Sequence, residues 1–386
     1  MKTRIILPLA AMLTFLLAGL STGSPMLLMP AALLLMAVTG GLSSVLWAAK
    51  TFTLSGGLDQ ASVRRGEEAV LTLEMRHRGL FPVAPVTLEI SSGVGQPVRE
   101  IRLRDMPGKL QSLSVPFRAD HVGIVSPGVR AWRMEDLFGF FRYRRVVDES
   151  LFRLTVLPNL FSTEPLTLSP GDPGSDIMAR ATEDLSAPSD IRSYQAGDPL
   201  KKVHWKLSLR KQELLVRKYD EPILQEVLIL MDCSRPPSWG EPEAEADVRD
   251  ALLETAASVF ADQQETDLSV HFPLFGSRPV ELEKSTGLSL ALENLALLDF
   301  SETDRFERVL VLESRRLRKV GCLVIVSARL NSALVDVMIR LRHMGPSLRL
   351  YLITYNPEDP NLLPLISRLQ QNGAQVYYVR PDRVPA

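Results

Sequence analysis

The first fifty residues restrict the fold more than any other part of this chain. No charged residue occurs between Arg4 and Lys50, and two apolar runs, Ile5–Leu20 and Pro25–Trp47, are separated by the short segment "STGS". The second run is long enough to cross the hydrocarbon core of a bilayer, which requires about 20 apolar residues. The first run is shorter and needs neighbouring residues to complete a span. We therefore expect residues 1–50 to form two transmembrane helices in a tight hairpin.

The charges that flank this hairpin predict its orientation. Lys2 and Arg4 precede it and Lys50 follows it, whereas the turn between the two apolar runs carries no charge. Because Lys and Arg favour the cytoplasmic side, both ends of the hairpin and all later domains should be cytoplasmic in a two-pass protein of the inner (cell) membrane. A cleaved signal peptide also begins with basic residues before an apolar run. The second apolar run argues against that alternative.

Composition limits the classes of function that remain. The net charge of −1 gives the chain as a whole no attraction for nucleic acid. Its two cysteines, Cys233 and Cys322, lie in or beside apolar runs typical of strands, so they indicate small buried side chains and no disulfide framework. A reducing compartment suits this usage.

Residues 53–160 are typical of an all-β, sandwich-like domain. Apolar and polar residues alternate in "AVLTLEMRHRG", "APVTLEI", "REIRLR" and "QSLSVPFR", and Gly, Pro and Ser separate these segments. Alternation with a period of two indicates strands with one buried and one solvated face. An aromatic turn at 136–140 closes the domain, and we expect Phe138 and Phe140 to plug the end of the sandwich.

The pattern changes after this domain. Residues 161–189 are rich in Ser, Pro, Gly and Asp, which predicts a linker or loop. From residue 223 to residue 386, apolar strands such as "EVLILMD" and "VGCLVIVS" alternate with segments of helical periodicity. This alternation predicts an α/β domain of Rossmann type, with a parallel sheet covered by helices.

The first strand of that domain ends in a candidate metal site. Asp232 and Ser234 follow it directly, and ligands of open α/β sheets bind beyond the carboxyl ends of strands. Asp-x-Ser-x-Ser at this place is similar to the Mg²⁺ site of von Willebrand factor A-type domains, where oxygen ligands suit the ion. Here Pro236 replaces the last Ser, and Ser327 stands where a second carboxylate is expected. We therefore expect a degenerate site with little or no Mg²⁺ binding, in which Asp232 caps its own loop.

Common enzyme signatures are missing from the sequence, including GxxxxGK[ST], GxSxG, HExxH and CxxC. We therefore expect that the protein is not an enzyme and binds no cofactor. An alternative is a hydrolase of unknown substrate whose site includes Asp198 and His204.

The segment 190–222 is the most unusual part of the soluble chain. Seven Lys or Arg residues lie between positions 201 and 218, beside Trp205 and Tyr219. Such a mixture can bind nucleic acid. The neutral chain favours instead a solvated face with paired charges. Residues 203–205 and 214–219 alternate like two strands, which predicts a hairpin that docks on the α/β domain and buries Trp205 as a clasp.

This segment resembles the signature R-x-Y-x-x-G-D…I/V-x-W-K-x-S-x-R…L-x-V-K/R-x-Y-x-x-E of bacterial domain-of-unknown-function family fifty-eight. The matching residues are Arg192, Tyr194, Gly197, Asp198, Val203, Trp205, Lys206, Ser208, Arg210, Leu214, Val216, Tyr219 and Glu221. The family is similar to this chain almost throughout, with two membrane helices, a β-rich segment ending in a D-x-F-G-L-F-like turn, the signature, and a von Willebrand A-like domain.

The resemblance implies a membrane-anchored interaction protein and no established catalysis. Genes of the family neighbour a MoxR-type AAA+ ATPase, transglutaminase-like membrane proteins and other von Willebrand A proteins, which implies partnership in chaperone-like assembly or activation of other proteins. The candidate partner-binding residues are those of the signature: Arg192, Tyr194, Gly197, Asp198, Trp205, Lys206, Ser208, Arg210, Tyr219 and Glu221.

Overall fold

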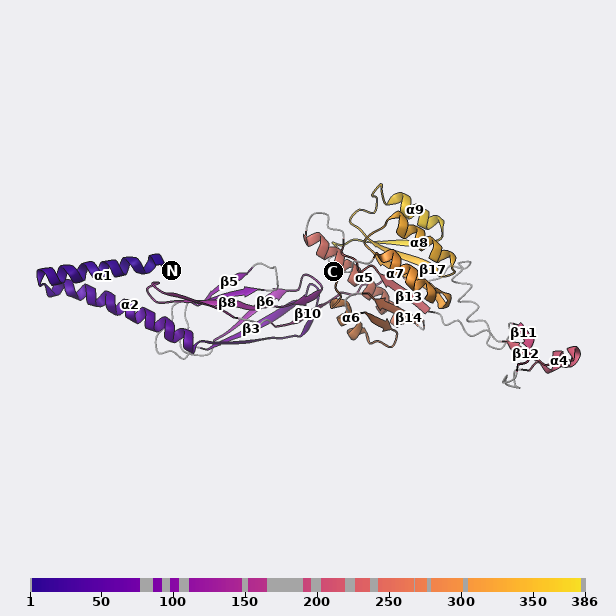
Figure 1. Cartoon of the computed structure of the whole chain (residues 1–386), viewed down its shortest axis with the longest axis horizontal. Coiled ribbons are helices and arrows are strands. Elements are labelled where there is room, and N and C mark those ends of the chain that lie inside the picture. The colour runs from indigo at the N-terminus through magenta and orange to yellow at the C-terminus, as the bar shows by residue number, and fades with distance from the viewer. Residues whose placement is uncertain are drawn as a thin grey trace. The chain divides into compact units, whose positions relative to one another are not determined.

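The computed structural model describes residues 2–76, 86–91, 98–103, 111–147, 152–164, 190–195, 203–218, 226–236, 242–266, 268–275, 279–300 and 305–382 (Figure 1). The chain divides into two compact units, Met1–Leu157 and Pro158–Ala386.

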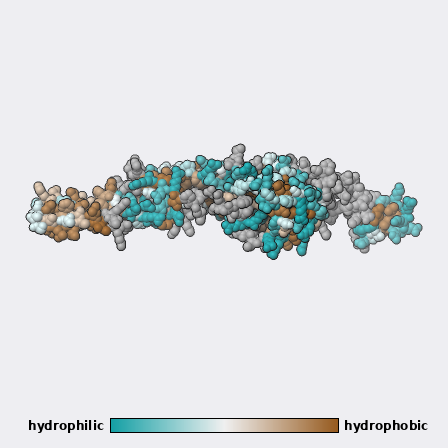
Figure 2. Space-filling model, turned by 90° about the horizontal axis from the view of Figure 1, so that it is seen from above, coloured by the Kyte–Doolittle hydropathy of each residue, from teal (hydrophilic) through white to brown (hydrophobic). Residues whose placement is uncertain are grey.

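The first unit begins with an apolar helical pair, α1 (Lys2–Thr22) and α2 (Pro25–Thr51). Gly23 adopts a positive φ of 64° at the turn between them, a conformation that Gly reaches at little steric cost. Both helices are long and apolar enough to cross a membrane. Figure 2 shows a predominantly hydrophobic surface, coloured brown, over this pair. The last turns of α2 behave differently, because Ala48, Ala49 and the following Phe52 are buried in the core of the β domain.

The β domain of the first unit contains two antiparallel sheets that share this core and a small mixed sheet beside a second buried cluster. One sheet has the order β1-β3-β6 and another the order β5-β4-β8-β9, while the short strands β2, β10 and β7 form a third. In β3, Ala69, Leu71, Leu73 and Met75 are buried, as the period of two predicts. The strands are β1 (Thr53–Leu58), β2 (Ser62–Arg64), β3 (Glu68–Arg76), β4 (Val86–Ser91), β5 (Arg99–Leu103), β6 (Gln111–Arg118), β7 (Gly123–Val125), β8 (Gly128–Glu135), β9 (Arg142–Val146) and β10 (Leu154–Leu157).

The aromatic turn between β8 and β9 differs from expectation. Asp136 is buried, and its carboxylate accepts hydrogen bonds from the backbone N–H groups of Phe138 at 3.1 Å and Phe141 at 2.6 Å. This carboxylate holds the turn, so the aromatic rings are not needed to close it. Phe138 is exposed and stacks on Phe140 with 5.5 Å between ring centroids. The prediction that Phe138 and Phe140 plug the end of the sandwich is therefore wrong.

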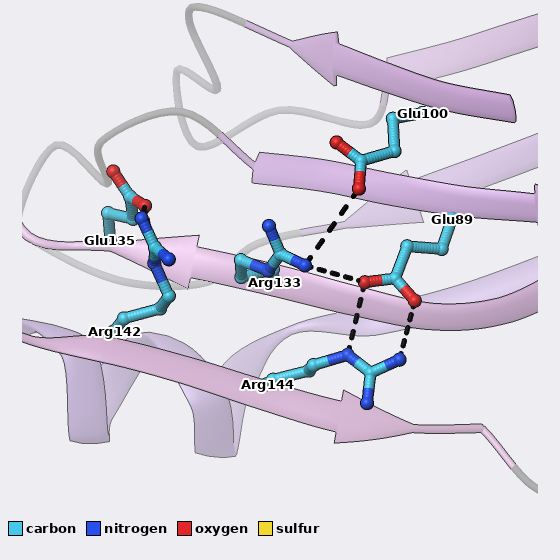
Figure 3. Close-up of polar contacts among 6 residues, drawn as sticks. All are labelled: Glu89, Glu100, Arg133, Glu135, Arg142 and Arg144. Carbon is cyan, nitrogen blue, oxygen red and sulfur yellow. Dashed lines mark hydrogen bonds and ion pairs between the residues drawn. The ribbon is translucent and has the colours of Figure 1, made fainter. Parts of the chain in front are cut away.

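A row of charges crosses the four-stranded sheet (Figure 3). Glu89 on β4 accepts two hydrogen bonds from Arg144 on β9, at 3.0 and 2.6 Å, and one from Arg133 on β8 at 2.9 Å. Arg133 also lies 3.9 Å from Glu100 on β5. The Arg144 hydrogen bond is the main reason that the pKa of Glu89 lies below its usual value, although burial opposes the shift. Glu89 thereby joins the two arginines, which face each other in the register of β8 and β9.

The second unit is built on a six-stranded sheet with the order β15-β14-β13-β16-β17-β18. All neighbours are parallel except β15, which pairs antiparallel with β14 at the edge. In chain order this is 3-2-1-4-5-6, the order of doubly wound sheets. The strands are β13 (Glu226–Met231), β14 (Ser269–Leu274), β15 (Val280–Glu283), β16 (Val320–Ser327), β17 (Ser347–Ile353) and β18 (Gln375–Val379).

Helices supply the apolar contacts of this sheet. Leu228, Leu230, Leu323 and Ile325, which alternate along β13 and β16, share one core with α7 (Phe306–Glu313), α8 (Ser332–His343) and α9 (Leu363–Gln371). The long helix α5 (Pro242–Gln264) contacts four strands of the sheet, and Phe260 packs against Phe272 of β14. This unit also contains α6 (Leu288–Ala296) and the 3₁₀ segment η2 (Ser314–Lys319).

An extended segment at the start of this unit binds a row of polar side chains along α5. The backbone N–H groups of Asn159, Phe161 and Thr163 donate to the side chains of Glu254 at 3.4 Å, Ser258 at 3.0 Å and Asp262 at 3.0 Å. Alternate residues of an extended chain thus meet residues four apart on a helix. Residues 158–164 therefore belong to the α/β unit.

Candidate functional site

Two strand ends meet at the point where the order of the sheet reverses. β14 follows β13 on one side, whereas β16 lies on the other side of β13. Asp232 comes directly after β13 and Ser327 is the last residue of β16, and both are buried. Such a reversal is where open α/β sheets bind ligands. The sequence-predicted Asp232 and Ser234 therefore lie at the expected place.

Both oxygens of the Asp232 carboxylate have hydrogen-bond partners among their neighbours. Oδ1 accepts from the backbone N–H of Ser234 at 3.0 Å and from the Ser234 hydroxyl. Oδ2 accepts from the Ser327 hydroxyl at 3.0 Å. The same hydroxyl oxygen accepts from the backbone N–H of Arg329 at 3.0 Å. Asp232 thus caps its own loop and ties the ends of the two central strands together.

An open pocket lies beside this cluster. Its lining includes Asp232, Arg235, Arg305, Glu307 and Arg329. The guanidinium of Arg329 donates to the backbone carbonyl of Arg235, and Asn331 donates to Glu307 at 2.9 Å while capping the first turn of α8. Apart from Asp232, sequence reasoning missed these residues because they come from three separate segments: the loop after β13, the start of α7 and the loop after β16.

These residues do not form a good Mg²⁺ site. Hard divalent cations prefer several carboxylate or carbonyl oxygens. Asp232 is one carboxylate with both oxygens already hydrogen-bonded, Glu307 is held by Asn331, and three arginines line the same pocket. Ser301–Asp304, a further candidate source of ligands, lies outside the described residues.

A second group of possible metal ligands lies at the sheet edge. His271 of β14 and Glu281 and Glu283 of β15 have ligand atoms within 4.8 Å of one another. Arg316 contacts Nε2 of His271 and donates to Glu281 at 2.9 Å, which lowers the pKa of Glu281. A guanidinium therefore already supplies the positive charge of this cluster.

The family-like segment forms a small module of two strands and one helix. β11 (Asp190–Ser193) pairs antiparallel with β12 (Leu215–Lys218), and α4 (Trp205–Lys211) lies between them in the chain. The predicted hairpin of residues 203–205 with 214–219 is therefore wrong. Its only trace in the described residues is a single bridge between Val203 and Val216.

Two signature-region side chains explain why a helix forms here. Nδ1 of His204 accepts from the backbone N–H of Leu207 at 3.3 Å and so caps the start of α4. Ser208 is buried, donates to the carbonyl of His204 at 3.0 Å, and accepts from the N–H of Leu215 at 2.9 Å. These bonds fasten α4 to β12. The structure therefore gives His204 and Ser208 positions that hold the module together.

The opposite side of α4 is exposed and partly apolar. Trp205 and Leu209, one helical turn apart, are 55% and 78% exposed, and the basic Lys206 and Arg210 are exposed beside them. The prediction that Trp205 is buried as a clasp is wrong in this structure, because the helix turns Ser208 inward and Trp205 outward. We call this set of four residues the α4 face.

The remaining signature residues are only partly described. Tyr194 donates its backbone N–H to Leu214 at 2.8 Å, and the Arg192 side chain donates to the carbonyl of Ser193 at 3.2 Å. Four further candidates lie outside the described residues: Gly197, Asp198, Tyr219 and Glu221. The structure therefore brings together Arg192, Tyr194, Trp205, Lys206, Ser208 and Arg210 in one module, whereas Asp198 lies outside the described residues.

The fold and site define a class: a chain with an N-terminal apolar helical pair, antiparallel β-sheets, and an α/β sheet joined to a small strand–helix–strand module. Residues 190–278 match the model of the family "Protein of unknown function DUF58". The match includes the segment that carries the signature, so the resemblance to this family is supported over these residues.

Other comparisons add little. No curated protein matches. Among solved structures, the chain is similar to a β-glucosidase, EmGH1, from Erythrobacter marinus, at 11% identity over 28% of this chain and 15% of that one, with a TM-score of 0.17. It is also similar to the sporulation control protein Spo0M from Bacillus subtilis, at 13% identity over 38% of this chain and 58% of that one, with a TM-score of 0.18. The chain spans less than two thirds of either, and neither likeness establishes a shared fold.

Proposed function

We propose that this chain is a membrane-anchored interaction protein that binds a MoxR-type AAA+ ATPase and helps it assemble or activate other proteins. Other von Willebrand A or transglutaminase-like membrane proteins are further expected partners. The observation that carries the proposal is the α4 face, which lies within the family segment. The choice of ATPase comes from the family resemblance.

The α4 face has the composition of a binding surface. Trp and Arg are enriched among the residues that dominate binding energy at protein interfaces. Trp205 exposes more than half of its surface, whereas Ser208 is buried. The helix therefore directs Ser208 toward the module and Trp205 toward solvent. The basic Lys206 and Arg210 would favour an acidic rim on the partner and accelerate association.

The architecture of the α/β unit supports a von Willebrand A-like interaction domain. The order 3-2-1-4-5-6, the antiparallel third strand and the Asp232-x-Ser234 loop are compatible with that class. The engaged carboxylate and the arginine-lined pocket favour an interaction that does not depend on Mg²⁺.

The helical pair supplies the anchor in this proposal. Lys2 and Arg4 at one end and Lys50 at the other favour a cytoplasmic position for both ends, where an AAA+ ATPase would have access to the α4 face.

Crosslinking and affinity capture from detergent-solubilised membranes test the proposal directly. The full chain should capture the ATPase in an amount that changes between samples with and without ATP. Recovery of no ATPase under either condition, from membranes in which both proteins are present, would contradict it.

A further inference from the structure

We propose that the turn Asp136–Phe141 is a second membrane contact, which inserts Leu137 and Phe138 into the headgroup level of an anionic bilayer beside α2. This inference rests on the proposed membrane anchoring. The proposed contact gives the β domain a lipid-binding surface, which would set the orientation of that domain relative to the membrane.

The level of the membrane surface along α2 follows from α1. The uncharged part of α1, Ile5–Thr22, has 18 residues. At a rise of 1.5 Å per residue it covers about 27 Å, close to the hydrocarbon thickness. The same length measured along α2 from Pro25 ends near Leu42. The rest of α2, which continues to Thr51, then lies at the headgroups and beyond.

The turn is fixed to α2 at this level. Gly41 is buried, and a Cβ atom on it would lie 2.9 Å from Oδ2 of Asp136. The close approach therefore requires Gly at position 41. Further along, Phe52 packs on Trp132 of β8 with 4.9 Å between ring centroids. Contacts at both points hold the end of α2 against the β domain, so the turn cannot lie far from the membrane surface.

The turn exposes the side chains that an interface favours. Leu137 is 67% exposed and Phe138 is 60% exposed. Its polar groups are satisfied internally: the Asp136 carboxylate accepts two backbone N–H groups, and the Asp136 N–H donates to the carbonyl of Phe141 at 3.2 Å. Internal satisfaction of the backbone lowers the cost of entering a less polar medium.

Charged and aromatic neighbours complete the surface. Trp47, 53% exposed, lies on α2 about 8 Å beyond Leu42, where aromatic side chains anchor membrane proteins at the interface. The strand that leaves the turn begins with the sequence "RYRR", in which Arg142, Arg144 and Arg145 are exposed, although Arg142 also pairs with Glu135 and Arg144 with Glu89. Basic residues near the cytoplasmic surface are attracted by anionic lipids. A lipid occupant explains the apolar tip and the basic strand together.

Site-directed spin labelling of the full chain in vesicles of phosphatidylethanolamine and phosphatidylglycerol tests the proposal. Cys233 and Cys322 are buried, so the unsubstituted protein serves as the blank. Labels at Leu33→Cys in α2, Phe138→Cys in the turn and Ile124→Cys in β7 all replace exposed side chains. Collision with oxygen, relative to collision with a water-soluble nickel complex, reports the depth of each label.

We expect the highest ratio at position 33, an intermediate ratio at 138 and the ratio of bulk water at 124. A ratio at 138 equal to that at 124, with position 33 deep, would overturn the lipid contact and leave the anchoring intact. A water-like ratio at position 33 would overturn the anchoring itself. If the label at 138 is shielded from both reagents, the turn is covered by protein and the proposal is again wrong.

Discussion

The hydroxyl of Ser327 donates a hydrogen bond to Oδ2 of Asp232 at 3.0 Å, which joins the ends of β16 and β13 at the reversal point of the sheet. Ser327 stands where the sequence comparison with metal sites leads us to expect a second carboxylate. The Ser327 hydroxyl is a hydrogen-bond donor within the protein, so the Asp232 oxygens have partners without a bound metal ion.

Magnesium binding should accordingly be weak or absent. Isothermal titration calorimetry of the detergent-solubilised protein should detect no Mg²⁺ binding in the low micromolar range, because Asp232 and Glu307 are already hydrogen-bonded and three arginines line the same pocket. Asp232→Asn serves as the control with the carboxylate charge removed. Low micromolar affinity in the parent chain, lost in that variant, would show that the site is functional.

The Glu89 network predicts a pH-dependent contribution to stability. The pKa of Glu89 is lower in the folded state than in the unfolded state. Ionised Glu89 therefore stabilises the fold fully at pH values above its unfolded pKa. This contribution is lost as the pH falls through the pKa that Glu89 has in the folded state. At neutral pH, Glu89→Gln should cost about 1–3 kcal/mol, because Arg133 and Arg144 lose a buried charged acceptor (Figure 3).

Thermal unfolding of both proteins at neutral and at strongly acidic pH measures this difference. The gap in melting temperature should narrow toward acid. Glu100→Gln, at an exposed carboxylate 3.9 Å from Arg133, is the matched control and should have a much smaller effect. A gap that stays constant with pH would mean that the Glu89 charge does not stabilise the β domain.

Two tryptophans should respond differently to truncation. Trp132 is 3% exposed and packs against Phe52 and Tyr143, so Trp132→Ala should cost about 3–5 kcal/mol. Trp205→Ala, at an exposed position, should change the free energy of unfolding by about 0.5 kcal/mol or less. Melting curves of the two variants provide the comparison. A fall of several degrees for Trp205→Ala would restore the clasp interpretation.

The proposed topology is tested by reporter fusions after Lys50 and at Ala386. Both should give cytoplasmic activity, because basic residues flank the hairpin and its turn is uncharged. An exported reporter at Ala386 would contradict the orientation and favour the signal-peptide alternative.

Regular periodicity explains which elements could be predicted from sequence. The alternation in β3 and the continuous apolar runs of β13 and β16 each match a strand, because burial of one or both faces leaves a direct pattern in the residues. The helical spacing of Val248, Leu252, Ala256 and Val259 likewise matches the buried side of α5. Asp232 and Ser327 were predictable as strand-end residues for the same reason.

The errors concern elements that depend on a few polar contacts. α4 has only seven residues and is held by the His204 cap and the Ser208–Leu215 bond, neither of which has a periodic signal. The composition predicts the β domain up to residue 160 and a linker from residue 161, yet the backbone N–H groups of Asn159, Phe161 and Thr163 are bound by Glu254, Ser258 and Asp262. That spacing of four along α5 was a usable signal for a docked segment. The turn at Asp136 is a similar case, because hydrogen bonds to its carboxylate hold the turn where we expected packed aromatic rings.

The affinity of the full-length protein for the candidate ATPase tests the central claim most directly. Binding is measured in detergent with the parent chain, Trp205→Ala on the α4 face, and Leu312→Ala, another exposed apolar residue that lies on α7. Truncation of an interface hot spot costs about 2 kcal/mol or more, so Trp205→Ala should weaken binding by roughly thirtyfold, whereas Leu312→Ala should leave it unchanged. Equal affinity for all three proteins, or equal loss in both variants, would contradict the assignment of the α4 face as the partner-binding surface.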